Sequence, residues 1–298
     1  MNLKLGIVIL NYNEYAMTLN LINILKSYKE IDHIVVVDNA SPNNSFKYLL
    51  ENNDKSWVLI KANENKGYAS GNNIGIRYLI DNFDVDIIGI INPDVIFTNE
   101  FVYQIKQTFI EKKDYAIITG LQLKPDGSIN KSAYWKDATI SRLLISNSYI
   151  LSKIENIFND AISKQMKNEE KVITVASVEG SCFFIRTKDM QRIGLFDENT
   201  FLFCEEGILS KKLKKINRKI GINKEITFIH NHSTTMKKVF SKINITKMML
   251  KSKRYFLINY ISNAWWAKLL YDITSLTCIL EEIFIMYPYY KIKNRIKK

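Results

Sequence analysis

Three short runs of the sequence carry acidic or imidazole side chains that suit chemistry on a phosphorylated substrate. In the first, Asn92, Pro93 and Asp94 follow apolar or small residues at 87–91. This pattern predicts a strand that is buried on both faces and ends at a carboxylate. A carboxylate beside an amide, without a neighbouring His or Cys, favours Mg²⁺ or Mn²⁺ shared with substrate phosphates. We therefore predict a cation at Asp94, with a simple turn after a core strand as the alternative.

The second run is the acid pair Glu205 and Glu206, which begins a predicted helix rich in lysine toward its end. Adjacent carboxylates are candidates for acid–base chemistry on a bound substrate. Acids in the first turn and lysines in the last turn also complement the dipole of any helix. The pair is therefore either catalytic or a helix-stabilising feature.

The third run contains His230 and His232, which alternate at a strand-like end. Alternation places both imidazoles on one side, where they would complete the coordination of a metal or bind a phosphate. The alternative is that both are structural histidines with their hydrogen bonds satisfied inside the protein.

Alternating strand and helix patterns position the first of these runs. Predicted strands end at residues 10, 37, 60 and 91, with helical patterns between them. Such βαβ units imply right-handed crossovers and a mostly parallel sheet flanked by helices, which is an α/β fold. Asn11, Tyr12, Asp38 and Asp94 then lie along one rim, and this rim is the predicted nucleotide site.

A loop rich in asparagine and glycine at 63–75 lies between the second and fourth strands. Gly67 would let the backbone approach a ligand, the following helix would offer its N-terminus to a phosphate, and Lys66 would add a charge. A loop that only caps a helix has the same composition. The spacing fits neither a Walker motif nor a dinucleotide fingerprint.

Six motifs, in this order, resemble the family 2 glycosyltransferases, especially their bacterial rhamnosyltransferase-like branch. They lie at residues 35–41, 65–73, 92–95, 179–186, 193–198 and 203–206. The resemblance implies a glycosyltransferase A (Rossmann-like) fold, a divalent metal (Mg²⁺ or Mn²⁺) and an inverting transfer from a nucleotide-diphosphate sugar. It also implies donor-binding roles for Asn11, Tyr12, Asp38, Lys66, Gly67, Asn72, Asn92, Asp94 and Gly180.

The resemblance assigns roles to the remaining chemical residues. Asn92 and Asp94 match the family's D-x-D motif, in which the last acid binds the metal, so Asn92 is expected to hydrogen-bond the sugar or ribose. Glu206 matches the family's general base but is one methylene longer, which leaves open whether Glu206 or Glu205 faces the acceptor. His230 matches the family's single metal-binding histidine better than His232 does.

Composition limits the partners and the compartment. The 298 residues carry a formal charge of +12 and 47% hydrophobic side chains, which indicates a globular protein with acidic partners. The three widely spaced cysteines form neither a disulfide framework nor a zinc signature, so we expect a reducing, cytoplasmic location. The sequence predicts no signal peptide and no spanning helix.

We divide the chain into a catalytic domain at 1–240, with a nucleotide-binding half at 1–98 and an acceptor-binding half at 99–240, and a helical extension at 241–298. The extension combines Trp265, Trp266 and closing tyrosines with many lysines and arginines. This composition suits either an anionic membrane surface on the inner face of the cell membrane or helices packed on protein. A homodimer is left open.

The predicted function is metal-dependent inverting transfer of a sugar to a hydroxyl of a saccharide acceptor, lipid-linked and destined for a cell-surface polysaccharide. One alternative is a sugar nucleotidyltransferase, which would require a glycine- and arginine-rich triphosphate loop that residues 11–15 do not provide. The other is a non-enzymatic basic protein that binds membrane or nucleic acid. The preferred hypothesis includes no nucleic-acid partner.

Overall fold

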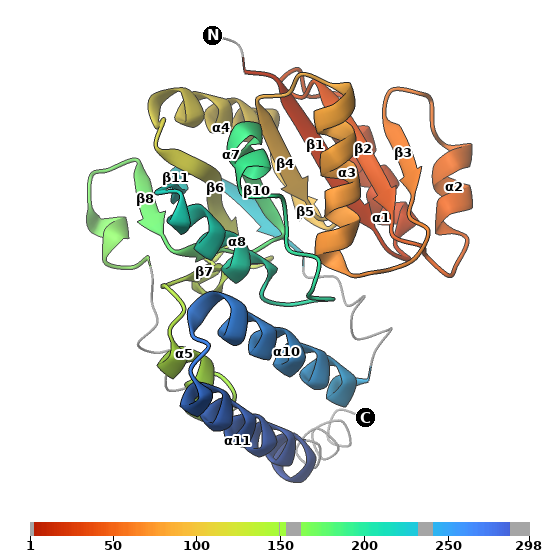
Figure 1. The fold of residues 1–298 in the computed structure, drawn as a ribbon. Helices are drawn as coiled ribbons and strands as arrows, with labels where there is room; N and C mark the ends of the chain where they lie inside the picture. The colour runs from red at the N-terminus through yellow and green to blue at the C-terminus, as the bar shows by residue number, and fades with distance from the viewer. Residues whose placement is uncertain (1–2, 149, 153–161, 232–240, 287–298) are drawn as a thin grey trace.

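A computed structural model describes residues 3–148, 150–152, 162–231 and 241–286 (Figure 1). Its amino-terminal part alternates strands and helices, as predicted. The elements are β1 (Leu5–Asn11), α1 (Tyr15–Leu25), β2 (His33–Asp38), α2 (Ser45–Glu51), β3 (Val58–Lys61), α3 (Tyr68–Asn82) and β4 (Ile87–Ile91). Strands β3, β2, β1 and β4 pair in that order and in parallel. Their carboxyl ends therefore meet at one edge.

The sheet continues into a mixed second half. The elements there are β5 (Val95–Ile96), α4 (Asn99–Glu111), β6 (Tyr115–Leu123), β8 (Val172–Val175), β10 (Cys182–Arg186), α7 (Thr187–Arg192), α8 (Glu205–Lys215) and β11 (Lys219–His230). Beyond β4 the order is β10, β6, β11 and β5, with β8 also paired to β11. β10 runs antiparallel to β4 and β6, and β11 runs antiparallel to β5 and β8. The α/β fold is confirmed, and the parallel pairing predicted for most of the sheet is concentrated in its first half.

The largely apolar run at 172–186 is typical of one continuous strand, and that prediction is wrong, because the segment forms three strands. Between β8 and β10 lies β9 (Ser177–Val178), which pairs with β7 (Tyr134–Trp135) in a separate two-stranded sheet that follows η1 (Lys131–Ala133). Each piece satisfies its backbone hydrogen bonds with a different partner. The break before β10 releases Glu179, Gly180 and Ser181 from the sheet, at the edge that carries Asp94.

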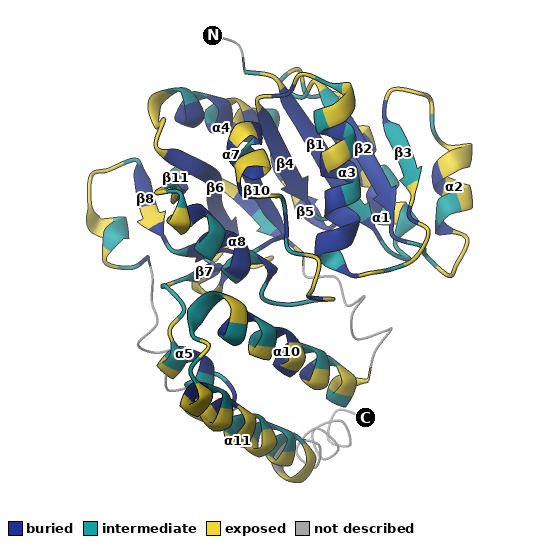
Figure 2. Ribbon diagram, in the orientation of Figure 1, coloured by how far each residue is buried: buried dark blue, intermediate teal, exposed yellow. Residues whose placement is uncertain are grey.

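Two apolar layers cover the sheet, which Figure 2 shows as almost continuously buried. Successive side chains of β1 point to opposite faces, so Val8 belongs to the layer with α3 and α8, and Ile7 belongs to the layer with α1 and α4. Continuous apolar strands are expected where helices cover both faces. The edge with the polar residues is therefore held by a rigid core.

The short helix η2 (Gln165–Lys167) lies beside β8 at the sheet, where Gln165 Nε2 donates to Thr174 O. The remaining helices form the part of the molecule farthest from the sheet in Figure 1. They are α5 (Ile140–Ile145), α10 (Lys242–Phe256), η3 (Leu257–Ile261), α11 (Trp265–Glu281) and η4 (Glu282–Met286). A third apolar cluster joins α5, α8 and the extension through Leu143, Ile208, Phe256, Leu257 and Tyr271. Over the described ranges, none of the helices has the length and apolar character needed to cross a bilayer.

Candidate functional site

The ends of β1 and β2 form the first part of the rim. Their parallel register places Asn11 beside Asp38, which is fully buried. Asn11 Nδ2 and Ser41 Oγ each donate to Asp38 Oδ2 at 2.7 Å, and the Ser41 backbone N–H donates to Oδ1 at 3.0 Å. Tyr12 follows directly and is half-buried. The three residues predicted for the nucleoside thus lie together, and their contact with a nucleotide stays a prediction.

The Gly67 loop packs against another part of the chain. Gly67 has a φ of +100°, and a Cβ there would lie 1.9 Å from the carbonyl oxygen of Phe201. The Tyr68 backbone N–H donates to that oxygen at 3.0 Å. Glycine is required at this position by a backbone contact as well as by its left-handed conformation. The donor-side loop is thereby tied to the segment that leads into α8.

Lys66 and Asn72 flank this contact differently. Lys66 Nζ lies 2.9 Å from Glu64 Oε1 in an exposed pair. Asn72 is buried in the first turns of α3, where its Nδ2 donates to Tyr68 O at 3.0 Å. Its Oδ1 is buried without a hydrogen-bond partner among the described residues. Contact with the nucleotide-sugar donor therefore fits the geometry of Asn72 better than the geometry of Lys66.

Asp94 and His230 meet where β5 pairs with β11. The antiparallel register sets His230 opposite Val95, and His230 Nε2 lies 3.2 Å from Asp94 Oδ1. The other ring nitrogen, Nδ1, lies 3.3 Å from Glu179 Oε1. Burial lowers the pKa of His230, but hydrogen bonds to the two carboxylates outweigh it and raise the pKa to about 9. His232, the second predicted ligand, lies outside the described residues.

Sequence reasoning missed Glu179 and Gln122, which surround the imidazole from the side opposite Asp94. Gln122 Nε2 lies 3.3 Å from His230 Nδ1. Such partners fix the orientation of a metal-binding histidine. The available signal for Glu179 was its place directly before the predicted sugar-contacting Gly180.

The described residues supply part of a cation site. Among them, no three His, Cys, Asp or Glu side chains are arranged to hold a metal. Asp94 and His230 provide one carboxylate and one imidazole, both buried, and the imidazole must lose its proton before it can bind a cation. A Mg²⁺-type site commonly uses one or two protein carboxylates, with substrate phosphates and water as the other ligands. The donor set therefore fits a divalent cation that arrives with a diphosphate.

Glu206 is held by the break before β10. Its Oε1 accepts a 2.9 Å hydrogen bond from the Gly180 backbone N–H, and the Tyr68 hydroxyl donates to Gly180 O at 2.6 Å. A Cβ at Gly180 would lie 2.6 Å from Glu206 Oε1, so glycine makes this approach possible. Gly180, predicted to contact the sugar, thus also positions the candidate base.

Glu205 begins α8 after Cys204, whose φ of 72° turns the chain sharply into the helix. The residue is only 4% exposed, and its Oε1 has no hydrogen-bond partner among the described residues. Burial and the adjacent Glu206 raise the pKa of Glu205, and burial also raises the pKa of Glu206. Both acids of the predicted pair belong to one desolvated site.

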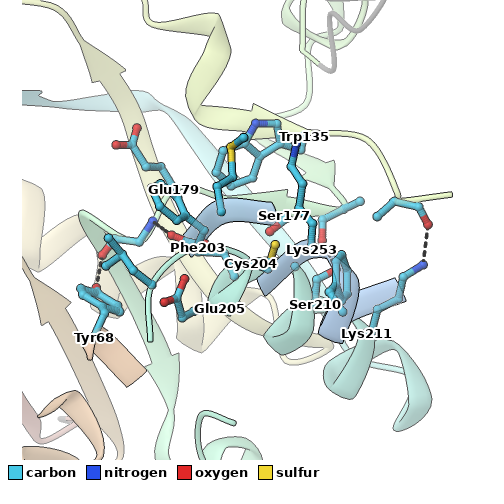
Figure 3. A pocket seen from close by; sticks show the side chains of 18 of the residues that line it. Tyr68, Trp135, Ser177, Glu179, Phe203, Cys204, Glu205, Ser210, Lys211 and Lys253 are labelled. Atoms are coloured by element: carbon cyan, nitrogen blue, oxygen red, sulfur yellow. Dashed lines mark hydrogen bonds between the residues drawn. The ribbon is translucent and has the colours of Figure 1, made fainter. Parts of the chain in front are cut away.

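A cavity of about 830 Å³ opens beside these acids. In Figure 3, Tyr68, Glu179 and Glu205 lie toward one end, and Ser210 and Lys211 lie toward the other. Asn92 lines the cavity too, and its backbone N–H donates to Ser181 O at 2.8 Å. Sequence reasoning missed the aromatic and apolar side chains that line it, which are Trp135, Phe203, Met249 and Phe256.

Met249 and Phe256 in this lining come from α10, which lies in the extension. The extension therefore closes the cavity. The sequence pattern gave no signal for this because the contact joins segments far apart in the chain.

Solved structures share the architecture of this chain. A mannosyltransferase, PcManGT from Pyrobaculum calidifontis in complex with GDP-Man and Mn²⁺, gives a TM-score of 0.57 at 12% identity, covering 92% of this chain and 74% of that one. GalNAc-T7 with UDP, GalNAc and Mn²⁺ gives 0.59 at 13% identity, covering 97% and 57%. The fold is that of the glycosyltransferase A enzymes.

Sequence comparison identifies the family. The profile described as "Glycosyl transferase family 2" matches residues 6–194, so the chain belongs to this family. A low-salt glycan biosynthesis hexosyltransferase, Agl10 of Haloferax volcanii, is 25% identical over 227 residues, which are 76% of this chain and 67% of that protein. Rhamnosyltransferase WbbL of Escherichia coli K12 is 25% identical over 180 residues, 59% of this chain and 65% of that protein. The protein is a glycosyltransferase, and neither the nucleotidyltransferase nor the non-enzymatic alternative is supported.

Proposed function

We propose that this glycosyltransferase moves one hexosyl or rhamnosyl unit, with inversion, from a nucleotide-diphosphate sugar to a hydroxyl of a saccharide acceptor. One observation carries the proposal. A chain of contacts joins Asp94 to His230, His230 to Glu179 and, one residue further, Gly180 to Glu206. It connects a group suited to the diphosphate with a group suited to the acceptor, as a transfer between the two requires.

Glu206 serves as the general base. Its Oε1 is fixed by the Gly180 N–H, and the carboxylate borders the cavity. As the acceptor oxygen bonds to the anomeric carbon, its proton passes to Glu206. The bond between that carbon and the diphosphate oxygen breaks, and the nucleoside diphosphate leaves. Attack opposite the leaving group inverts the anomeric centre.

Asp94 and His230 would hold Mg²⁺ or Mn²⁺ at the diphosphate. The bound cation supplies Lewis-acid stabilisation of the negative charge that grows on the leaving group. Asn92, two residues before Asp94, lines the cavity and would hydrogen-bond the sugar or ribose. Asp38 and Asn11 form the base- and ribose-binding part of the rim.

The acceptor occupies the cavity between α8 and α10. Aromatic walls such as Trp135 and Phe203 suit the apolar faces of sugar rings, and the apolar lining continues to Phe256. The names of the two relatives, a glycan-biosynthesis hexosyltransferase and a rhamnosyltransferase, support an acceptor in glycan synthesis, which we infer to be that of a cell-surface polysaccharide. We infer that the acceptor is lipid-linked and that the enzyme works at the cytoplasmic face of the membrane.

Product analysis tests this function. The purified chain is incubated with UDP-, GDP- and dTDP-sugars, Mn²⁺ and lipid-linked saccharides, and the masses of the products are measured by mass spectrometry. The expected result is an acceptor heavier by one sugar residue, with an inverted anomeric configuration by NMR. Release of nucleotide without a glycosylated acceptor from any donor would contradict the proposal, and a retained configuration would contradict the inverting mechanism.

A further inference from the structure

The outward side of the last helices is apolar along its whole length. Six large side chains on α11 and η4 follow a spacing of three or four residues and are all at least 44% exposed: Trp265, Leu269, Ile273, Leu276, Leu280 and Phe284. This spacing places them on one stripe, which we call the apolar face. At 1.5 Å per residue the face is roughly 28 Å long. Figure 2 shows the helix exposed along this outer side.

Several polar side chains of the same helix bond to groups elsewhere on the protein. Asn147 Nδ2 donates to Thr274 Oγ1 at 3.2 Å, and Ser148 Oγ donates to Glu281 Oε1 at 2.8 Å. Arg254 Nε lies 2.7 Å from Asp272 Oδ1. Thr274 and Glu281 are thus bonded to the turn that follows α5, and Asp272 pairs with α10 at the surface, while the large apolar groups of α11 face outward. This is the reverse of a water-exposed helix.

We propose that the apolar face lies in the interfacial region of an anionic lipid bilayer. A helix of this kind binds in the plane of the membrane, with its apolar side toward the acyl chains. Trp265 and Trp266 at one end suit the headgroup level. An apolar face of this length would contact the membrane along the whole helix and not through a single side chain.

Charge selects an anionic surface. The chain carries +12, and the sequence that directly follows the face, 287–298, contains five Lys or Arg and no acidic residue. Lys247 and Lys251 are exposed on α10, the helix that packs beside α11. Basic residues beside an apolar stripe bind anionic lipids in a salt-sensitive way. The same charge disfavours a second copy of this chain as the partner, because two basic surfaces repel.

The position of this surface relates it to the cavity. α10 contributes Met249 and Phe256 to the cavity wall and packs against α11 on its other side. A docked helix pair would therefore hold the cavity close to the lipid headgroups. The link to a lipid-linked acceptor rests on the proposed function, whereas the bilayer contact does not.

Vesicle co-sedimentation of the full chain tests the surface. Vesicles of phosphatidylcholine alone are compared with vesicles that contain phosphatidylglycerol, at low and high salt. The test variant is Leu269→Ser/Ile273→Ser/Leu276→Ser. Leu276→Ser and Leu50→Ser form a matched pair, because these leucines are 59% and 56% exposed on helices of different parts of the molecule.

We expect binding to anionic vesicles only, weakened by salt, with a partition coefficient about tenfold or more lower in the triple variant. Leu276→Ser should weaken binding and Leu50→Ser should not. Three results would overturn the inference: no binding by the unaltered protein, equal binding by the triple variant, or a dimer in light scattering that the triple variant converts to a monomer without any vesicle binding. Should the triple variant unfold, the matched pair decides.

A parallel assay of sugar transfer to a water-soluble acceptor separates the two proposals. Vesicle binding without transfer contradicts the proposed function and leaves the membrane surface intact. Transfer without vesicle binding contradicts the membrane surface and leaves the proposed function intact.

Discussion

Replacing Glu206 with glutamine should remove the base while preserving the site. The carboxylate accepts from the Gly180 N–H at 2.9 Å, and the amide oxygen of glutamine can accept the same hydrogen bond. Side-chain volume and packing stay nearly constant. The amide cannot take the proton of the acceptor hydroxyl, so the loss falls on the chemical step.

The size of the loss follows from this geometry. General base catalysis contributes typically about 10² to 10⁴-fold, so kcat of Glu206→Gln should fall within that range. Donor binding depends on the Asp94 and Asp38 side of the rim, so donor affinity should change less than about threefold, equivalent to about 0.7 kcal/mol. Burial raises the pKa of Glu206. Because the base must be ionised, kcat of the unaltered enzyme should rise with pH as Glu206 loses its proton, and this rise should vanish in the variant.

Steady-state kinetics across pH measure kcat, and donor titration by calorimetry measures donor affinity. Glu205→Gln is the matched control. We expect the control to retain most of its kcat. A dead Glu205→Gln enzyme beside an active Glu206→Gln enzyme would show that the acid with the unpartnered oxygen is the base. Full activity in both variants would refute general base catalysis by either acid.

Four further outcomes are expected. Burial and its neighbouring acid raise the pKa of Glu205 to about 8. The folded protein then holds a proton that the unfolded chain loses at lower pH, so stability falls as pH rises from about 4.5 to about 8. Glu205→Gln should weaken this dependence, to which the buried Glu206 also contributes, and should be more stable than the unaltered protein by at least about 1 kcal/mol at pH 8.5, measured by denaturant unfolding.

Asp94→Asn should lower Mn²⁺-stimulated turnover by about 100-fold with little change in Tm, and full activity in EDTA would exclude a metal role. Gly67→Ala should raise the donor KM and lower Tm more than Gly127→Ala, because both glycines have positive φ but only Gly67 would meet backbone atoms. Phe256→Ala should cost about 3–5 kcal/mol in unfolding free energy, and a loss below about 1 kcal/mol would show that the extension is not part of the folded core.

The parallel half of the fold was predictable because it depends on local patterns. Apolar runs bounded by polar turns fixed the strands that end at Asn11, Asp38 and Ile91, and the alternation with helices fixed their parallel pairing. The second half was less predictable. The pattern at 172–186 predicts one apolar strand, yet its parts pair with four different strands, and this choice depends on partners far away in sequence.

The sequence predicted which residues form the site better than it predicted the contacts between them. Asp94, His230 and the acid pair were expected, and the structure brings Asp94 within 3.2 Å of His230. The pairing of Glu206 with Gly180 was not expected, because it requires a break in a strand and a left-handed turn at Cys204. Lys66 was expected at the donor but is paired at the surface with Glu64.

The reversal of β10 relative to β4 explains why one edge can serve two substrates. Because the strands are antiparallel, the start of β10 lies beside the end of β4, and the Asn92 N–H bonds to Ser181 O at 2.8 Å. Three consecutive residues before β10 make three different contacts. Glu179 lies against His230, Gly180 donates to Glu206, and Ser181 accepts from the backbone of the Asp94 turn. A nucleotide-sugar donor that moves Asp94 or His230 would therefore also move residues 179–181, which position the base. Binding of the diphosphate should therefore adjust the position of Glu206 through Glu179 and Gly180, which would couple acceptor activation to donor binding.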